Sequence, residues 1–183
     1  SSFQLSIVLV VAVIPNFESF HREYEAERNQ VVFSKLTSDL ETPVSIMLKL
    51  GEAKTNSFIL ESVTGGETRG RYSIIGMEPD LIWKCDGDRS FLSSGGEEFI
   101  YIEGKPLTVF RNILKKSKIK LPEDLPQASA GLFGYFGYDM VRHVENLPNI
   151  NPDKIGLPDA MFIRPSIIAV LDGVKGEVIL VSP

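Results

Sequence analysis

Ser57-Phe58-Ile59-Leu60-Glu61-Ser62-Val63-Thr64-Gly65-Gly66 is followed, after two further residues, by Arg69-Gly70-Arg71-Tyr72-Ser73-Ile74-Ile75-Gly76. These are two short apolar runs joined by a glycine-rich connector, which predicts two β-strands. The first run ends on Glu61 and Ser62, so a carboxylate and a hydroxyl come directly after an apolar strand. Such a strand end suits a pocket for an amino acid. A strand whose polar end residues simply enter a turn is the alternative interpretation.

Two arginines, Arg69 and Arg71, flank the connector. A guanidinium can hold the carboxylate of a ligand through two parallel hydrogen bonds. It can equally pair with Glu61 in a purely structural contact, and the sequence leaves both interpretations open. Tyr72 and Ser73 follow with an aromatic ring and a hydroxyl.

The remaining elements follow from caps, turns and periodicity. Asn16 and Thr42-Pro43 predict two helix starts, and the spacing of Leu107, Phe110 and Ile113 predicts a third helix. Strands are expected in the ranges 7–14, 30–36, 57–62, 72–76, 81–85, 90–92, 99–102, 131–138, 162–171 and 177–181. Because strands outnumber helices and lack regular helical crossovers, the predicted fold is α+β, with mainly antiparallel, sandwich-like sheets and about three flanking helices.

The second helix is expected to present Val44, Met47 and Leu48 on one apolar face. Gly51 is expected to end it in the left-handed conformation. Asp86-Gly87 is a signal for a type I′ turn.

Three glycines, Gly131, Gly134 and Gly137, are separated by pairs of residues that include aromatics. Their spacing fits neither a dinucleotide fingerprint nor a P-loop. A strand to which another backbone comes close, or in which a bulge forms, is expected instead.

The composition excludes several classes of protein. The chain has 183 residues, a net charge of -5 and 43% hydrophobic residues, which are ordinary values for a globular protein. It has no basic patch interleaved with aromatics, so nucleic-acid binding is not expected. The single cysteine, Cys85, cannot form an internal disulfide, and with His21 and His143 it does not make a zinc site. We expect Cys85 to pack in a strand, with a Cys–His nucleophilic pair as the alternative.

Several separate blocks resemble, in order, the amino-terminal domain of anthranilate synthase component I, a chorismate-utilising family. The resemblance runs from about Pro15 to the last residue. It predicts a non-matching apolar segment at 1–13 and the amino-terminal domain at 14–183, with the chorismate-binding domain absent. The blocks outside residues 57–76 are Phe17-Glu18-Ser19-Phe20, Gln30-Val31-Val32, Asp39-Leu40-Glu41-Thr42-Pro43-Val44-Ser45 and Gly131-Leu132-Phe133-Gly134-Tyr135-Phe136-Gly137-Tyr138-Asp139.

The resemblance implies an effector site and no catalytic or metal-binding residue in this part of the protein. The triplet Leu60-Glu61-Ser62 is expected to line the site where L-tryptophan binds as an allosteric feedback inhibitor. Further expected members of that site are Arg71, Tyr72 and Ser73.

The resemblance also implies a contact with the catalytic domain near Tyr138, Asp139 and Arg142. An ion pair or a capping group at the junction of a strand and a helix is the alternative interpretation of Asp139 and Arg142.

In the resembled family the complete lyase makes anthranilate and pyruvate from chorismate, in the first step of tryptophan biosynthesis. A glutamine amidotransferase subunit supplies ammonia, and Mg²⁺ binds in the chorismate-binding domain. The chain is therefore expected to be cytoplasmic and inactive alone. The alternatives are the amino-terminal domain of aminodeoxychorismate synthase component I, from the folate pathway, a stand-alone amino-acid-binding module, or a secreted β-protein suggested by residues 7–14.

Overall fold

The computed structural model describes residues 11–51, 55–61, 70–148 and 152–183. Ser62, Arg69, the glycine-rich connector and residues 7–10 of the first expected strand lie outside the described residues. The elements, with η for a 3₁₀ helix, are α1 (Phe17–Glu25), β1 (Val32–Thr37), α2 (Pro43–Leu50), β2 (Phe58–Leu60), β3 (Tyr72–Asp86), β4 (Arg89–Ser94), β5 (Ile100–Ile102), α3 (Pro106–Lys116), η1 (Gln127–Ser129), β6 (Phe133–Phe136), η2 (Tyr138–His143), β7 (Ala160–Asp172) and β8 (Glu177–Ser182).

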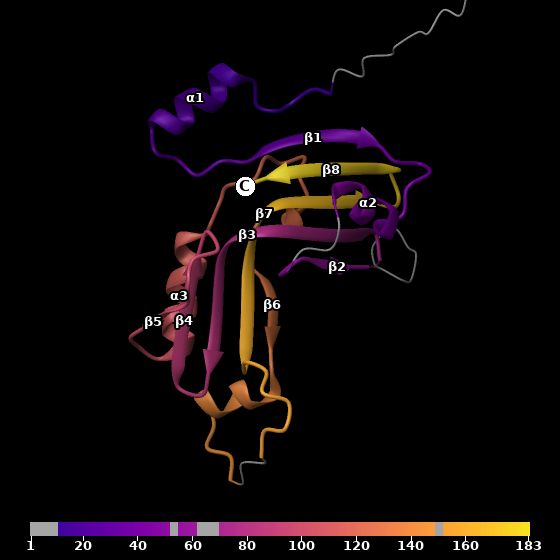
Figure 1. The fold of residues 1–183 in the computed structure, drawn as a ribbon. Coiled ribbons are helices and arrows are strands. Elements are labelled where there is room, and N and C mark those ends of the chain that lie inside the picture. Colours follow the sequence, from indigo (N-terminus) through magenta and orange to yellow (C-terminus); the bar gives the residue numbers. More distant parts are fainter. Residues whose placement is uncertain (1–10, 52–54, 62–69, 149–151) are drawn as a thin grey trace, which may run out of the picture.

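The described strands form one antiparallel sheet that bends into two sections (Figure 1). The long strands β3 and β7 run through both sections. In the upper section of Figure 1 the strand order is β1-β8-β7-β3-β2. In the lower section the order is β6-β7-β3-β4-β5. The predicted α+β class with antiparallel pairing is confirmed.

The bend lies where two prolines face each other, Pro79 on β3 and Pro165 on β7. The register shifts there, between Pro79 and Leu81. Glu78 has a positive φ of 50°, and its carbonyl accepts a hydrogen bond of 2.6 Å from Ser166 Oγ. A bulge of this kind turns a strand sharply without ending it.

The expected break between strands 72–76 and 81–85 was therefore wrong, because one bent strand covers both ranges. A proline inside an apolar run reads as an interruption, although a bulge accommodates it. Next to the bend, Arg164 binds the Asp80 carboxylate with two hydrogen bonds, Nε to Oδ1 at 2.7 Å and Nη2 to Oδ2 at 2.9 Å. This ion pair links β7 to β3 at the corner.

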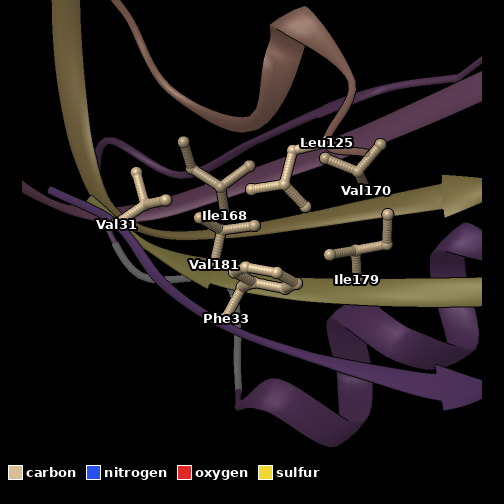
Figure 2. Packing of buried hydrophobic residues seen from close by; sticks show 7 residues of the cluster. All are labelled: Val31, Phe33, Leu125, Ile168, Val170, Ile179 and Val181. Carbon is tan, nitrogen blue, oxygen red and sulfur yellow. The ribbon is translucent and has the colours of Figure 1, made fainter. Parts of the chain in front are cut away.

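The upper section has a hydrophobic cluster on each face of the sheet. Ile168 and Val170 point to one face, and Ala169 and Leu171 to the other, as strand alternation requires. Figure 2 shows the first cluster, in which Leu125 reaches the strands from the loop before η1. Its members are Val31, Phe33, Leu125, Ile168, Val170, Ile179 and Val181.

Helix α2 covers the second cluster. Thr42 and Ser45 form a reciprocal capping box at its start, as expected from the Thr-Pro signal. Ile46 and Met47 are buried against the sheet, whereas Val44 and Leu48 are exposed, so the expected apolar face was wrong in part. Apolar residues occur all round this short helix, and periodicity cannot then select the buried side.

Two local expectations at glycines were also wrong. Gly51 follows α2 with φ 131° and ψ 167°, which is not the left-handed helical conformation. In the β3–β4 hairpin, Asp86 pairs with Arg89, so the turn residues are Gly87 and Asp88. Only the first of them has a positive φ, which is the type II′ pattern and not type I′.

The lower section packs α3 over an aromatic cluster. The ring of Phe110 lies 4.7 Å from Trp83 and 4.6 Å from Phe162, centroid to centroid. Phe136 lies 4.7 Å from Phe162. Cys85 is fully buried in this cluster, as expected for a packing residue.

The close backbone approach expected at the spaced glycines is confirmed at Gly134 and Gly137 but not at Gly131, where an added Cβ would meet nothing within 4 Å. A Cβ on Gly134 would lie 2.0 Å from the Met161 carbonyl oxygen, and one on Gly137 would lie 2.8 Å from that of Asp159. Both glycines let β6 and the start of η2 lie against β7.

The described N-terminal residues are only loosely attached to the sheet. Of the strand expected at 7–14, the described part makes an isolated bridge in which Ile14 and Phe33 exchange two hydrogen bonds of 2.8 Å. Helix α1 starts at Asn16 as expected, with Oδ1 accepting a hydrogen bond from Ser19 N, but it buries none of its side chains. None of the helices among the described residues is long and apolar enough to cross a membrane.

Candidate functional site

The residues predicted to bind an effector lie at one end of the upper section, where β2 pairs with β3. Leu60 lies opposite Ile74 on the β3 strand, and β2 forms the edge of this section. Leu60 and Glu61 are both exposed. Ser62 lies outside the described residues. The first two members of the triplet are therefore accessible at an edge of the sheet.

Alternation along β3 divides the predicted set between two faces. Tyr72 and Ile74 pack against the cluster of Figure 2, and Leu60, directly across from Ile74, shares their face. Ser73 points to the other face, toward α2, and is 8% exposed. The sequence pattern did not separate these residues, because neighbours along a strand are close in sequence but opposite in direction.

Arg71 is bound to a residue that the sequence analysis did not consider. Its Nε and Nη2 donate to the two carboxylate oxygens of Asp172, at 2.9 and 2.5 Å. The two open interpretations of Arg71, a ligand or Glu61 as partner, both missed this pair. No local signal identifies it, because the residues are 101 positions apart and meet only when β3 pairs with β7. The Arg71 guanidinium also lies 4.9 Å from the ring centre of Tyr72.

Asp172 is buried, with its side chain 3% exposed. Arg71 lowers the pKa of this carboxyl below its ordinary value, and the N–H groups of Lys175 and Val174 act in the same direction. These two N–H groups donate to Oδ1 at 3.2 and 3.0 Å. Asp172 thus holds Arg71 and the β7–β8 turn in one arrangement.

A cavity of about 480 Å³ opens beside this pair. Arg71 and Ser73 belong to its wall, whereas Leu60, Glu61 and Tyr72 do not. The structure therefore places Arg71 and Ser73 in one cavity and Leu60 and Glu61 at the adjacent sheet edge, whereas Tyr72 packs against the cluster of Figure 2. The full lining is Ser38, Asp39, Glu41, Pro43, Gly70, Arg71, Ser73, Leu171, Asp172, Gly173, Val174, Lys175 and Gly176.

The cavity offers both signs of charge. Asp39 and Glu41 contribute carboxylates from the segment before α2, and Arg71 and Lys175 contribute cations. Hydrogen bonds from Lys49 and Ser45 lower the pKa of Glu41, so this carboxyl is ionised at neutral pH. Carboxylates and cations in the wall of one cavity are the groups that bind the ammonium and the carboxylate of a free amino acid.

The predicted interface residues lie at the far end of the lower section, on η2. Arg142 Nε binds Asp139 Oδ1 at 2.7 Å, which is the local ion pair of the alternative interpretation. Arg142 also donates to the Leu147 carbonyl at 2.8 Å. Tyr138 is 84% exposed. These three residues line a second cavity, of about 860 Å³.

Cys85 and His143 are neighbours, with Sγ 3.8 Å from Nε2. Burial raises the pKa of the Cys85 thiol to about 11, so it is protonated at neutral pH and is a poor nucleophile. Its contacts are those of a core residue. The described residues contain no group of three or more His, Cys, Asp or Glu side chains that could hold a metal ion.

Three known proteins that are similar to this chain in sequence carry the same name. No family model matches the chain. It is 58% identical over 172 residues to anthranilate synthase component 1 of Cereibacter sphaeroides, a match covering 92% of this chain and 34% of the relative. The protein of the same name from Pseudomonas putida is 36% identical over 175 residues, covering 92% and 35%. The Acetivibrio thermocellus protein is 36% identical over 147 residues, covering 80% and 30%.

One solved structure is also similar, that of anthranilate synthase component I from Streptococcus pneumoniae TIGR4. It has 26% identity and a TM-score of 0.49, and the match covers 78% of this chain and 29% of that chain. The chain spans about a third of the length of its curated relatives and matches their amino-terminal portion. Because of its sequence identity to these curated relatives, the chain belongs to the anthranilate synthase component I family and corresponds to the amino-terminal region of its members.

Proposed function

We propose that this chain is the regulatory amino-terminal part of a cytoplasmic anthranilate synthase, the lyase that makes anthranilate and pyruvate from chorismate. The observation that carries the proposal is the 58% identity over 172 residues to a protein of that name. In this proposal the chemistry, the Mg²⁺ that binds chorismate and the contact with the ammonia-supplying glutamine amidotransferase belong to other parts of the enzyme. The role of this chain is to bind an effector and to transmit its binding.

The proposed effector is L-tryptophan, bound between the edge of β2 and the adjacent cavity. Arg71 and Lys175 face the carboxylate of the amino acid, and Asp39 and Glu41 face its ammonium group. The mixed charge of the cavity supports this arrangement. Leu60 and Glu61 are exposed at that edge. Together with Ser62, the next residue in the sequence, they are the proposed contacts of the indole ring.

Inhibition requires that tryptophan bind one arrangement of the enzyme more tightly than another. The coupling free energy of such a device is typically about 1–3 kcal/mol, or roughly 5–150-fold in affinity. We propose that η2, with Tyr138, Asp139 and Arg142, contacts the catalytic part. The exposure of Tyr138 supports this placement.

The reaction is tested by joining this chain to the remainder of the enzyme and supplying chorismate and ammonia. Anthranilate is the expected product, and the 183-residue chain alone is expected to produce none. Formation of aminodeoxychorismate, or turnover by the chain alone, would contradict the proposal.

The effector site is tested in the same complete enzyme with Asp39→Asn and Ser62→Ala. Each change should raise the inhibitory tryptophan concentration, Asp39→Asn by roughly tenfold because a charge-assisted hydrogen bond is lost. Turnover without tryptophan should not change. Ser94→Ala, at an exposed position on β4, is the matched control. Inhibition curves that coincide with wild type would remove Asp39 and Ser62 from the site.

A further inference from the structure

A third cavity, of about 640 Å³, lies in the lower section, between the start of α3, strand β5 and η2. Its wall is basic. Lys105, Arg111 and Arg142 line it together with His143. The remaining lining residues are Asp88, Tyr101, Gly104, Pro106, Leu107, Thr108 and Val144.

Two of these basic side chains are held in place and two are accessible. Arg142 is anchored by Asp139 at 2.7 Å and by the Leu147 carbonyl at 2.8 Å. The side chain of His143 is mostly buried, beside Cys85. Lys105 and Arg111 are exposed on the first turns of α3. A ligand in the cavity would therefore meet a fixed wall made by Arg142 and His143, and two exposed cations that can adjust to it.

The backbone adds positive potential at the same place. Helix α3 has 11 residues and begins at this wall, with Pro106 in its first turn. Lys105 is its N-cap residue, and no side chain caps this helix end. The N-terminal end of a helix carries roughly half a positive elementary charge, which favours a bound anion.

Little negative charge opposes these groups. Of the described residues that line the cavity, only Asp88 is acidic, and its side chain, 3.8 Å from His143, is 99% exposed. Asp139 pairs with Arg142 but is not part of the wall. A carboxylate this exposed is well screened by water and salt. The wall of the upper-section cavity, by contrast, contains the carboxylates of Asp39, Glu41 and Asp172 beside the cations of Arg71 and Lys175. The two cavities therefore differ in the charge they can accept.

We infer that this third cavity binds a compact anion carrying at least two negative charges, as a phosphate group or as a pair of neighbouring carboxylates. Lys105 and Arg111 contact it directly, Arg142 and His143 form the wall behind it, and Tyr101, which also lines the cavity, offers its hydroxyl as a further donor. Two negative charges on one small group gain more from the cations of this wall than a single charge does, so a monoanion such as chloride should bind more weakly.

The inference is tested by calorimetric titration of the 183-residue chain with inorganic phosphate and, separately, with malonate, at constant ionic strength in chloride. Saturable binding of at least one dianion is expected. Binding of phosphate alone would identify a phosphate-bearing ligand, and binding of malonate alone or of both would identify the broader dianion chemistry. Binding of neither would overturn the inference.

The site is located with Arg111→Gln and Lys105→Gln, whose exposed side chains can be replaced without disturbing the core. Each should weaken binding by roughly tenfold, the usual effect of losing one charge-assisted contact. Arg89→Gln is the matched control, since it removes one exposed arginine of the same section that does not line the cavity. If Arg89→Gln weakens binding as much, the anion responds only to net charge and the site is refuted. The test needs no turnover, so its failure would leave the proposed lyase function untouched.

Discussion

The two sections of the sheet share β3 and β7 but are stabilised by different interactions. The lower section packs one aromatic cluster, in which Phe110 touches both Trp83 and Phe162. The upper section divides its apolar side chains between two faces and also buries a charged pair, Arg71 and Asp172. Although the two sections share their longest strands, the interactions that stabilise them are therefore different. The two sections differ in the short strands and turns that are added to these shared strands.

The largest expected effect is in the lower section. Phe110→Ala removes the ring at the centre of the aromatic cluster and should lower the free energy of unfolding by about 4 kcal/mol. Urea denaturation followed by tryptophan fluorescence measures it, since Trp83 lies in the same cluster. Leu114→Ala, at a position 43% exposed on the same helix, is the control and should cost less than about 1 kcal/mol. Equal losses for both would show that the cluster is not the main source of stability.

The next largest effect is expected when one of two ion pairs with the same geometry is broken. Asp172→Ala leaves Arg71 without its buried partner and should cost about 3 kcal/mol. Asp80→Ala breaks the bidentate pair with Arg164 at the bend, where the carboxylate is half exposed, and should cost about 1 kcal/mol or less. Both are measured by urea denaturation at neutral pH. If the two variants lose the same stability, burial does not distinguish the two pairs.

The acid dependence of stability sharpens this comparison. Because Arg71 lowers the pKa of Asp172, the pair contributes fully above the ordinary carboxyl pKa of about 4. That contribution is lost as the pH falls from there through the lower pKa of the folded state. The free energy of unfolding, measured from about pH 5 down to about pH 2, should therefore fall less steeply for Asp172→Asn than for wild type. Parallel curves would contradict this. Part of the slope should persist, because Lys35 and Lys49 also lower the pKa values of Asp124 and Glu41.

The smallest expected effect concerns helix ends. Thr42 Oγ1 accepts a hydrogen bond from Ser45 N at 3.1 Å, so Thr42→Ala should destabilise the upper section by about 1 kcal/mol. In the lower section, α3 has no side-chain cap, and Thr108→Ala in its first turn should change stability by less than about 0.5 kcal/mol. Thermal unfolding of both variants provides the measurement. A loss for Thr108→Ala that matched Thr42→Ala would mean that the two helix starts are equivalent.

Local signals in the sequence predicted most elements of both sections. Caps at Asn16 and Thr42 and the spaced glycines before β7 act over a few residues, and the structure has them where they were expected. The long strand β3 was read as two because Pro79 interrupts its pattern, and only pairing with β7 shows that the strand continues. The buried side of α2 is likewise decided by the sheet and not by the helix.

The candidate site was predictable only in part, for a related reason. Arg71 and Ser73 could be named from their neighbourhood in the sequence, but Asp172 and the carboxylates before α2 join them only through sheet pairing. Alternation along β3 then turned Tyr72 away from that cavity. Residues that share a motif need not share a surface, and the residues that complete a site can come from distant strands.

The facing prolines at the bend have one more consequence, for how the chain reaches its native pairing. Neither Pro79 nor Pro165 has a backbone N–H to donate. Placing them opposite each other confines the missing donors to one position of the β3–β7 pairing, where the Ser166–Glu78 hydrogen bond and the Arg164–Asp80 ion pair join the strands. Sliding β7 along β3 by two residues would keep every side chain on its own side, yet it would break both of these side-chain contacts. Misaligned pairings of β3 with β7 are thereby penalised at a single point. The register of β3 against β7 at the bend fixes the register of these strands in both sections, so the chain has to establish it only once.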